Sequence, residues 1–116
     1  MKNLVTRPWG NYTVLAKNKN FLLKKIIVKP KGVLSYQSHK YRSEHWIIIE
    51  GNATIIINDK VYKKKKNENI FIPKNAKHRV LNKSLKNNLI IVEVQTGLKF
   101  LETDIKRYSD IYGREN

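Results

Sequence analysis

Residues 32–51 read GVLSYQSHKYRSEHWIIIEG, and this stretch places three side chains of metal-ligand type within a few positions. Gln37 and His39 are two positions apart, so on a strand both side chains leave the same face. Glu44 follows His39 by five positions, which is the wrong parity for one unbroken strand. We therefore expect a turn or bulge within residues 40–43 that returns Glu44 to the side of His39.

Residues 67–82, NENIFIPKNAKHRVLN, add a fourth candidate donor, His78. Nitrogen and oxygen donors of these kinds suit Zn, Mn, Fe, Co or Ni, and four donors leave a coordination position open for substrate. The same side chains could instead be polar surface groups or hydrogen-bonded core groups. His45 could also replace Glu44 as a ligand, although its opposite parity argues that it points the other way.

Around these stretches the apolar segments are short and rich in Ile and Val. They are residues 12–15, 21–28, 46–49, 53–57, 70–72, 80–81 and 89–94. Turn-forming residues separate them, and Asn58-Asp59 fits a two-residue hairpin because both residues tolerate a positive φ. Many short strands with turns between them predict an all-β sandwich or barrel. Only residues 103–112 could form a short helical turn, capped by Thr103 and stopped by Gly113.

The chain has 116 residues, of which 41% are hydrophobic, and this fits a single globular domain over residues 1–116. It contains no cysteine, which excludes disulfide scaffolds, cysteine zinc sites, iron–sulfur clusters and thiol catalysis. No apolar run approaches the roughly 18 residues that span a bilayer. The polar start, with Pro8 and Gly10, does not resemble a secretory signal. We expect a cytoplasmic protein without a membrane partner.

The formal net charge is +15, from 24 Lys plus Arg against 9 Asp plus Glu. Such a charge could indicate binding to nucleic acid or to an anionic membrane. The lysines are scattered, however, apart from residues 63–66, and that run is explained most simply as a solvated loop or an edge strand. We therefore expect no nucleic-acid partner.

The five arginines lie at positions 7, 42, 79, 107 and 114 of a chain that otherwise uses lysine. A guanidinium binds phosphate or carboxylate through two parallel hydrogen bonds, whereas an ammonium is a point charge. The five arginines therefore indicate positions where the two parallel hydrogen bonds of a guanidinium are needed and a lysine could not replace it.

The two stretches together resemble the two sequence motifs of the cupin superfamily. The first motif is matched by Gln37, His39, Glu44 and Gly51, with Gly32 one residue closer to Gln37 than the pattern requires. The second is matched in spacing by Asn67, Pro73, Asn75, His78 and Asn82, where Asn replaces Gly at positions 67 and 75. Asn tolerates positive φ better than other non-glycine residues, so these replacements are mild. The resemblance implies an all-β cupin double-stranded β-helix, a jelly-roll barrel, here with a short C-terminal helical turn.

Residues 34–46, LSYQSHKYRSEHW, are similar to the signature of type II mannose-6-phosphate isomerases. These are cupin domains usually fused behind a mannose-1-phosphate guanylyltransferase. The start, residues 7–10, and the tail, residues 104–114, are similar to the same family. Lys40 and Tyr41 stand where the family often has further histidines. No Gly-rich nucleotide-binding loop is present, so we expect no nucleotide transfer.

The resemblance implies a metal-dependent aldose–ketose isomerase that interconverts mannose 6-phosphate and fructose 6-phosphate. One divalent ion, most simply Zn, would be bound by Gln37, His39, Glu44 and His78. Mn, Co, Fe and Ni are alternatives.

Around this site the resemblance suggests further roles. Arg42 lies inside the first motif and is expected to bind substrate or to stabilise charge in the transition state. His45, Lys40 or a water on the metal could be the base. Contacts with the phosphosugar substrate are expected from Lys40, Arg107 and Arg114. Arg79 follows His78 on a strand and is expected to point away from the barrel interior.

Plainer roles are open for the same residues. Arg42 could pair with Glu44 or Glu50, and Arg107 could pair with Asp104 or Asp110. Trp9 and Trp46 are expected to be core or interface aromatics.

One fold serves many functions among cupins, so a non-catalytic or differently acting sugar- or sugar-nucleotide-binding cupin is the alternative. A homodimer is expected, because Ile-rich strands can supply an interface. Mannose supply for surface polysaccharide is the role that the family resemblance implies.

Overall fold

The computed structural model describes residues 3–114, and these form eleven strands and no helix. The strands are β1 (Leu4–Arg7), β2 (Gly10–Lys17), β3 (Phe21–Val28), β4 (Tyr36–Ser38), β5 (Arg42–Glu50), β6 (Asn52–Ile57), β7 (Lys60–Lys65), β8 (Asn69–Ile72), β9 (His78–Leu81), β10 (Leu89–Gly97) and β11 (Lys106–Ser109). Within the described part of the chain no helix is long and apolar enough to cross a membrane.

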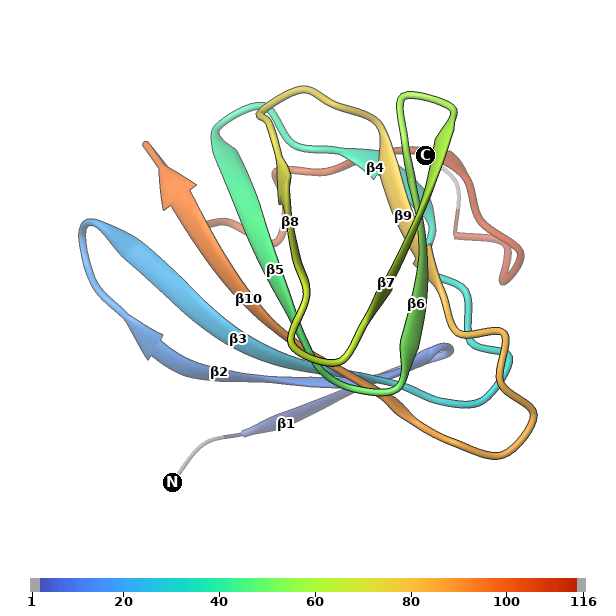
Figure 1. The fold of residues 1–116 in the computed structure, drawn as a ribbon. Coiled ribbons are helices and arrows are strands. Elements are labelled where there is room, and N and C mark those ends of the chain that lie inside the picture. The colour runs from blue at the N-terminus through green and yellow to red at the C-terminus, as the bar shows by residue number, and fades with distance from the viewer. Residues whose placement is uncertain (1–2, 115–116) are drawn as a thin grey trace.

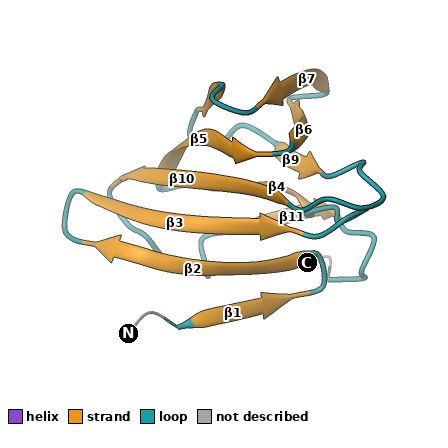
Figure 2. Cartoon of the chain, turned by 60° about the horizontal axis from the view of Figure 1, so that its bottom comes forward, coloured by secondary structure: helices purple, strands orange, loops and turns teal. Residues whose placement is uncertain are grey.

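The strands form two antiparallel sheets that face each other (Figure 1). The first sheet has the order β1-β2-β3-β10-β5-β8, and the second has the order β11-β4-β9-β6-β7. Figure 2 shows the first sheet from β1 through β10 to β5 as a stack of neighbouring strands. Strands far apart in sequence are therefore neighbours, and the expected all-β jelly-roll barrel is confirmed.

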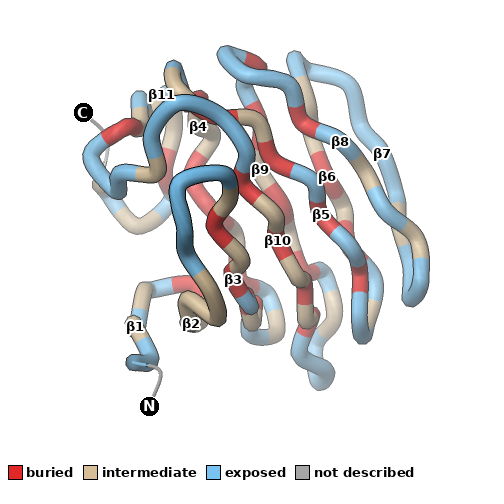
Figure 3. Tube along the Cα trace, turned by 90° about the vertical axis from the view of Figure 1, so that its left-hand side faces the viewer, coloured by how far each residue is buried: buried red, intermediate tan, exposed pale blue. Residues whose placement is uncertain are grey.

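The inner faces of the strands follow the alternation of the sequence (Figure 3). On β5 the residues Arg42, Glu44, Trp46 and Ile48 are buried, while the residues between them are exposed or half-buried. Because successive side chains on a strand point to opposite faces, this one strand supplies both polar and apolar side chains to the interior. The polar ones lie at its start and the apolar ones follow.

The apolar core fills the interior beyond the polar end of β5. It is built from buried side chains of both sheets, including Val28, Ile48, Ile55, Val80 and Ile91. The continuous burial of this set stabilises the barrel at roughly 25 cal/mol for each Å² of apolar surface removed from water. The apolar core holds the two sheets together. The interior around the polar start of β5 is where the candidate site lies.

The predicted turns are confirmed at three asparagine positions. Asn58 and Asp59 have φ of 47° and 69° and join β6 to β7 as the expected two-residue hairpin. Asn67 and Asn75, which stand where the cupin motif has Gly, have φ of 74° and 71°. Asparagine therefore performs the backbone role of glycine at both positions.

Replacement of Asn75 tests that reading. We expect Asn75→Ala to lower the free energy of unfolding by about 1 kcal/mol, because alanine is strained at positive φ. Asn75→Gly should leave stability nearly unchanged or raise it slightly. Urea unfolding monitored by tryptophan fluorescence measures both. Equal loss in the two variants would show that the asparagine side chain, and not its φ, matters.

The predicted C-terminal helical turn is wrong. Within residues 103–112 the chain forms strand β11, which pairs with β4 and is followed by a turn. The reason is tertiary: β4 is short and would otherwise be the edge of its sheet, so backbone pairing there outweighs local helix signals. Tyr108 and Tyr112 are four positions apart and would share one face of a helix, but here they make separate contacts. The Tyr108 hydroxyl lies 3.0 Å from Ser38 Oγ, and the Tyr112 hydroxyl accepts a bond from the Val33 amide.

Two surface features bear on association. The lysine run enters β7, which is the edge strand of the second sheet, as the charge pattern predicted. The outer face of β5 and β8 exposes Ile47, Ile49 and Phe71. The homodimer stays a prediction.

Candidate functional site

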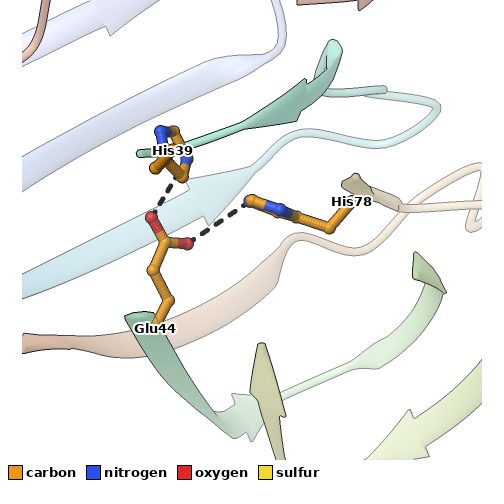
Figure 4. Close-up of side chains that lie close together, drawn as sticks. All are labelled: His39, Glu44 and His78. Atoms are coloured by element: carbon orange, nitrogen blue, oxygen red, sulfur yellow. Dashed lines mark ion pairs between the residues drawn. The ribbon is translucent and has the colours of Figure 1, made fainter. Parts of the chain in front are cut away.

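Three of the predicted metal ligands converge at the polar end of the barrel (Figure 4). Glu44 comes from β5 of the first sheet, His78 begins β9 of the second, and His39 directly follows β4. Glu44 Oε2 lies 3.2 Å from His39 Nε2, and Glu44 Oε1 lies 3.5 Å from His78 Nε2. One donor atom from each residue lies within 4.8 Å of the others, and all three side chains are buried.

The turn that Glu44 requires is formed by residues 39–41 and is held by Asp104. Its carboxylate accepts hydrogen bonds from the backbone amides of Lys40, at 2.8 Å, and Tyr41, at 2.9 Å. The predicted change of parity is therefore confirmed. The residue that holds it comes from the loop after β10, which no local pattern could indicate.

Both histidines are oriented by backbone carbonyls. His39 Nδ1 lies 2.7 Å from the Asp104 carbonyl oxygen, and His78 Nδ1 lies 3.0 Å from the Ala76 carbonyl oxygen. A carbonyl can only accept, so each Nδ1 carries a proton, and Nε2 is the ring atom of each histidine that faces Glu44 and would serve as the ligand. This is the arrangement usual for histidines that bind metals. Ligands at about 2.0–2.2 Å from one ion lie about 3–4 Å apart, so the three residues fit a divalent ion.

Gln37 lies beside this cluster. It is the register partner of His78 across β4 and β9 and lines the same cavity. Its amide nitrogen donates to the Ser35 carbonyl and hydroxyl oxygens, at 3.2 and 3.0 Å. That arrangement leaves the amide oxygen Oε1 as the atom able to coordinate. The role of Gln37 as a fourth ligand stays a prediction.

The shifted pKa values of His39 and Glu44 favour the protonation states in which these side chains bind a metal. Burial lowers the pKa of His39 to about 4, and the charge of Arg42 contributes in the same direction. Burial alone would raise the pKa of Glu44, but its interactions with His39 and His78 and the positive charge of Arg42 hold it well below its usual value. At neutral pH His39 is therefore neutral and Glu44 ionised, as metal binding requires. The hydrogen bond to Glu44 raises the pKa of His78 despite its burial.

Arg42 lies inside the cluster. Its Nε donates to Glu44 Oε2 at 2.9 Å, and its Nη2 lies 3.2 Å from His39 Nε2. A third bond, from Nη1, reaches the Leu101 carbonyl at 3.2 Å. The pairing with Glu44 is thus present, and it places a buried guanidinium directly beside the ligand atoms.

The cluster opens on a cavity of about 150 Å³ between the two sheets. Arg107 and Arg114 line it, as does Arg79, which was expected to point away. Arg79 reaches two backbone carbonyls, those of Leu34 and Ser109, and Arg114 pairs with Asp110 at 2.7 Å. Arg107 Nε is buried and has no hydrogen-bond partner within the described residues.

Two predicted site residues are not brought to this cavity. His45 is exposed on the outer face of β5, where its Nε2 lies 3.0 Å from Asn69 Oδ1 and its ring packs on Phe71. Its parity, opposite to that of Glu44, explains this position. Lys40 lies on a separate surface groove, beside Tyr41. Neither side chain is placed to act on a substrate held at the cluster.

Other polar residues of the cavity were not anticipated. Lys24, Glu93 and Glu102 all line it. Trp46, expected in the core, donates its indole N–H to both Glu44 Oε1 and Glu93 Oε2, at 3.1 and 3.0 Å. Burial raises the pKa of Glu93 to about 7, and the nearby Glu44 adds to the rise. One signal was available in the sequence: Lys24 occupies an inward position on β3, between buried Leu22 and Ile26.

Sequence comparison finds relatives along almost the whole chain. A family described as mannose-6-phosphate isomerase, C-terminal, matches residues 1–110. The alginate biosynthesis protein AlgA of Pseudomonas syringae pv. tomato is 42% identical over 97% of this chain and 23% of its own length. The mannose-1-phosphate guanylyltransferase ManC of Salmonella typhimurium is 40% identical over 98% of this chain and 24% of its own length. The chain therefore spans about a quarter of the length of these relatives.

Solved structures share the fold at low sequence identity. An RmlC-like cupin from Shewanella frigidimarina has a TM-score of 0.73 and 13% identity, covering 83% of this chain and 84% of its own. A variant of the Bacillus subtilis oxalate decarboxylase has a TM-score of 0.81 and 15% identity, covering 92% of this chain and 30% of its own. These likenesses confirm that the barrel is a cupin fold.

Proposed function

Because the chain belongs to the family of mannose-6-phosphate isomerase C-terminal domains, we propose that it is a metal-dependent isomerase of mannose 6-phosphate and fructose 6-phosphate. The observation that carries the proposal is the buried cluster of His39, Glu44 and His78 at a cavity lined by several arginines. An aldose–ketose isomerase needs an electrophile for the carbonyl and cations for the phosphate. Both requirements have candidates here.

His39, Glu44 and His78 would hold the ion, most simply Zn, through two Nε2 atoms and one carboxylate. When bound, such an ion would polarise the sugar carbonyl as a Lewis acid. Arg42 would place a fixed positive charge beside the oxygen atoms that gain negative charge as the enediolate forms. Its three hydrogen bonds hold the guanidinium in position before the reaction, so little reorganisation is needed.

Isomerisation transfers a proton between C1 and C2 and leaves the phosphate unchanged. We also propose that the activity is cytoplasmic, since the charge of a phosphorylated substrate prevents it from crossing a membrane unaided. The names of the relatives connect them with alginate biosynthesis and with guanylyl transfer. We propose only the isomerase step for this chain, with mannose supply for polysaccharide as its context.

A metal-addition assay tests the proposal directly. We expect chelator-treated protein to convert no mannose 6-phosphate and one or more of Zn, Mn, Co, Fe and Ni to restore conversion. A coupled assay for fructose 6-phosphate measures the rate, and calorimetry measures metal binding separately. Metal binding without turnover for any ion would contradict the isomerase.

That outcome would favour the alternative, a sugar- or sugar-nucleotide-binding cupin without this activity. One observation favours it: Arg42 already bonds atoms of both Glu44 and His39 that would face an ion. An ion would have to displace one of these contacts.

A further inference from the structure

Lys24 is a buried cation in an otherwise apolar row of side chains. The inward residues of β3 are Leu22, Lys24, Ile26 and Val28, and Lys24 is only 6% exposed. Burying an ammonium is costly unless it is paired, and an apolar residue at such a position is often as stable or more stable. Packing therefore does not explain why residue 24 is a lysine.

The partner of Lys24 is an unusual one. Its Nζ lies 3.3 Å from Glu102 Oε2 and 4.2 Å from the centre of the Tyr12 ring. The Tyr12 hydroxyl donates to the other oxygen of the same carboxylate, Glu102 Oε1, at 2.7 Å. The ammonium and the hydroxyl thus bind both oxygens of one anion. Burial, with the bond to Glu102, raises the pKa of Tyr12 to about 12, so the hydroxyl stays a donor.

The bound anion belongs to a loop and not to a strand of the barrel. Glu102 belongs to the loop between β10 and β11, and its side chain is 59% exposed, whereas that of Lys24 is 8% exposed. A carboxylate that remains largely in water can leave the pair at much less cost than a buried one, because its charge is easily hydrated. The cation is fixed and the anion is exchangeable.

The pairing register places this pair at a defined position relative to the metal cluster. In the first sheet Lys24 pairs with Glu93 and Glu93 pairs with Trp46. Neighbouring strands lie about 4.8 Å apart, so the backbones of Lys24 and Trp46 lie about 10 Å apart. Trp46 bonds the predicted ligand Glu44 and packs its ring against His78, with ring centres 5.7 Å apart.

The second sheet repeats this spacing. Arg107 pairs with Gln37 and Gln37 pairs with His78. Arg107 is therefore also two strands from the cluster, and it lines the same cavity as Lys24. The buried Nε of Arg107 is a donor that finds no acceptor among residues 3–114. Lys24 and Arg107 thus line one cavity with the metal-ligand cluster, on strands two removed from those of Glu44 and His78. A hexose 6-phosphate likewise carries its phosphate away from its carbonyl.

We propose that Lys24 and Tyr12, with Arg107, form the phosphate-binding subsite, and that Glu102 occupies it until the substrate phosphate displaces the carboxylate. This inference rests on the proposed function for the identity of the sugar, but the anion subsite itself does not. Glu102 would then compete with every ligand, and only a ligand with a stronger anion than a carboxylate would enter. The subsite selects sugar phosphates over free sugars.

Calorimetric titration with inorganic phosphate tests the subsite without reference to activity. We expect Glu102→Gln to bind phosphate about tenfold more tightly than the wild type, because a competing charge-assisted contact is lost. We expect Lys24→Met to bind it at least about tenfold more weakly. Lys25→Met, on the exposed outer face of β3, and Glu50→Gln, at an exposed pair with Lys66, are the matched controls and should bind as the wild type does.

The outcomes separate the two proposals. Equal phosphate affinity in Lys24→Met and Lys25→Met, or no tightening in Glu102→Gln, would overturn the subsite. In the coupled assay, Glu102→Gln should lower the KM for mannose 6-phosphate, and Lys24→Met should raise it. If both Lys24→Met and Glu102→Gln convert mannose 6-phosphate as the wild type does, the subsite is refuted and the isomerase is not. Phosphate binding that depends on Lys24, in a protein that converts no mannose 6-phosphate, overturns the isomerase alone.

Discussion

Replacement of His78 by alanine is expected to lower divalent metal affinity by at least about 100-fold and to abolish isomerase turnover. Loss of an outer partner of a metal ligand already costs about 10–100-fold, and this change removes a ligand. His78 is buried and its Nε2 faces Glu44 at 3.5 Å, so alanine removes one of the three donor groups that meet at the cluster. Calorimetry with the preferred ion and the coupled assay measure the two effects.

His45→Ala is the matched control for this experiment. It removes the same side chain from the outer face of β5, where His45 contacts Asn69 and Phe71. Metal affinity and turnover should therefore be unchanged. Circular dichroism and a melting curve establish that His78→Ala is folded. Full activity in folded His78→Ala would refute the metal mechanism, and loss of activity in His45→Ala would refute its placement outside the site.

Arg42→Lys is expected to lower kcat by about 100- to 1000-fold, the loss typical when one donor to a developing oxyanion is removed. Lysine keeps the charge, but it cannot donate to Glu44, His39 and the Leu101 carbonyl at once as the guanidinium does. The lysine is preferable to alanine because alanine would remove the positive charge that Glu44 contacts at 2.9 Å. Steady-state kinetics on the metal-loaded protein measures the effect.

The KM and the metal affinity of Arg42→Lys distinguish its possible roles. A fall in kcat with little change in KM or in metal affinity agrees with a role in the transition state. A rise in KM alone would assign Arg42 to substrate binding. Lower metal affinity would instead show that its bonds to Glu44 and His39 position the ligands. Arg79→Lys is the comparison, since that guanidinium lines the same cavity but bonds two backbone carbonyls instead of Glu44 and His39. An equal fall in kcat there would show that the effect is not specific to Arg42.

Several features of this protein follow from sequence alone because they depend on near neighbours in the chain. Strand segments are indicated by short apolar runs rich in Ile and Val between turn-forming residues, and Phe21–Val28 is predicted with its exact bounds. The turns at Asn58, Asn67 and Asn75 follow from the tolerance of asparagine for positive φ. The opposite parities of Glu44 and His45 also follow from the period of a strand, and the structure places the two side chains on opposite faces.

The tail shows where this local reasoning ends. Thr103 and Gly113 are sound helix signals, yet residues 106–109 pair with β4. A short segment has little intrinsic helical stability, so an available strand edge decides its structure. The presence of that edge depends on the arrangement of the other strands and is not encoded in the tail.

The remaining features were decided only by tertiary structure. Asp104 holds the turn after His39 from 64 residues away, and Glu102 reaches Lys24 from 78 residues away. Such contacts depend on which strands pair and in which register, and one-residue changes of register would reverse every side chain. The sequence thus determined the strands, the turns and the kinds of ligand that this protein carries. Only tertiary structure determined that three ligands meet, that Lys40 lies on a separate groove, and that a buried lysine lines the same cavity as Arg107.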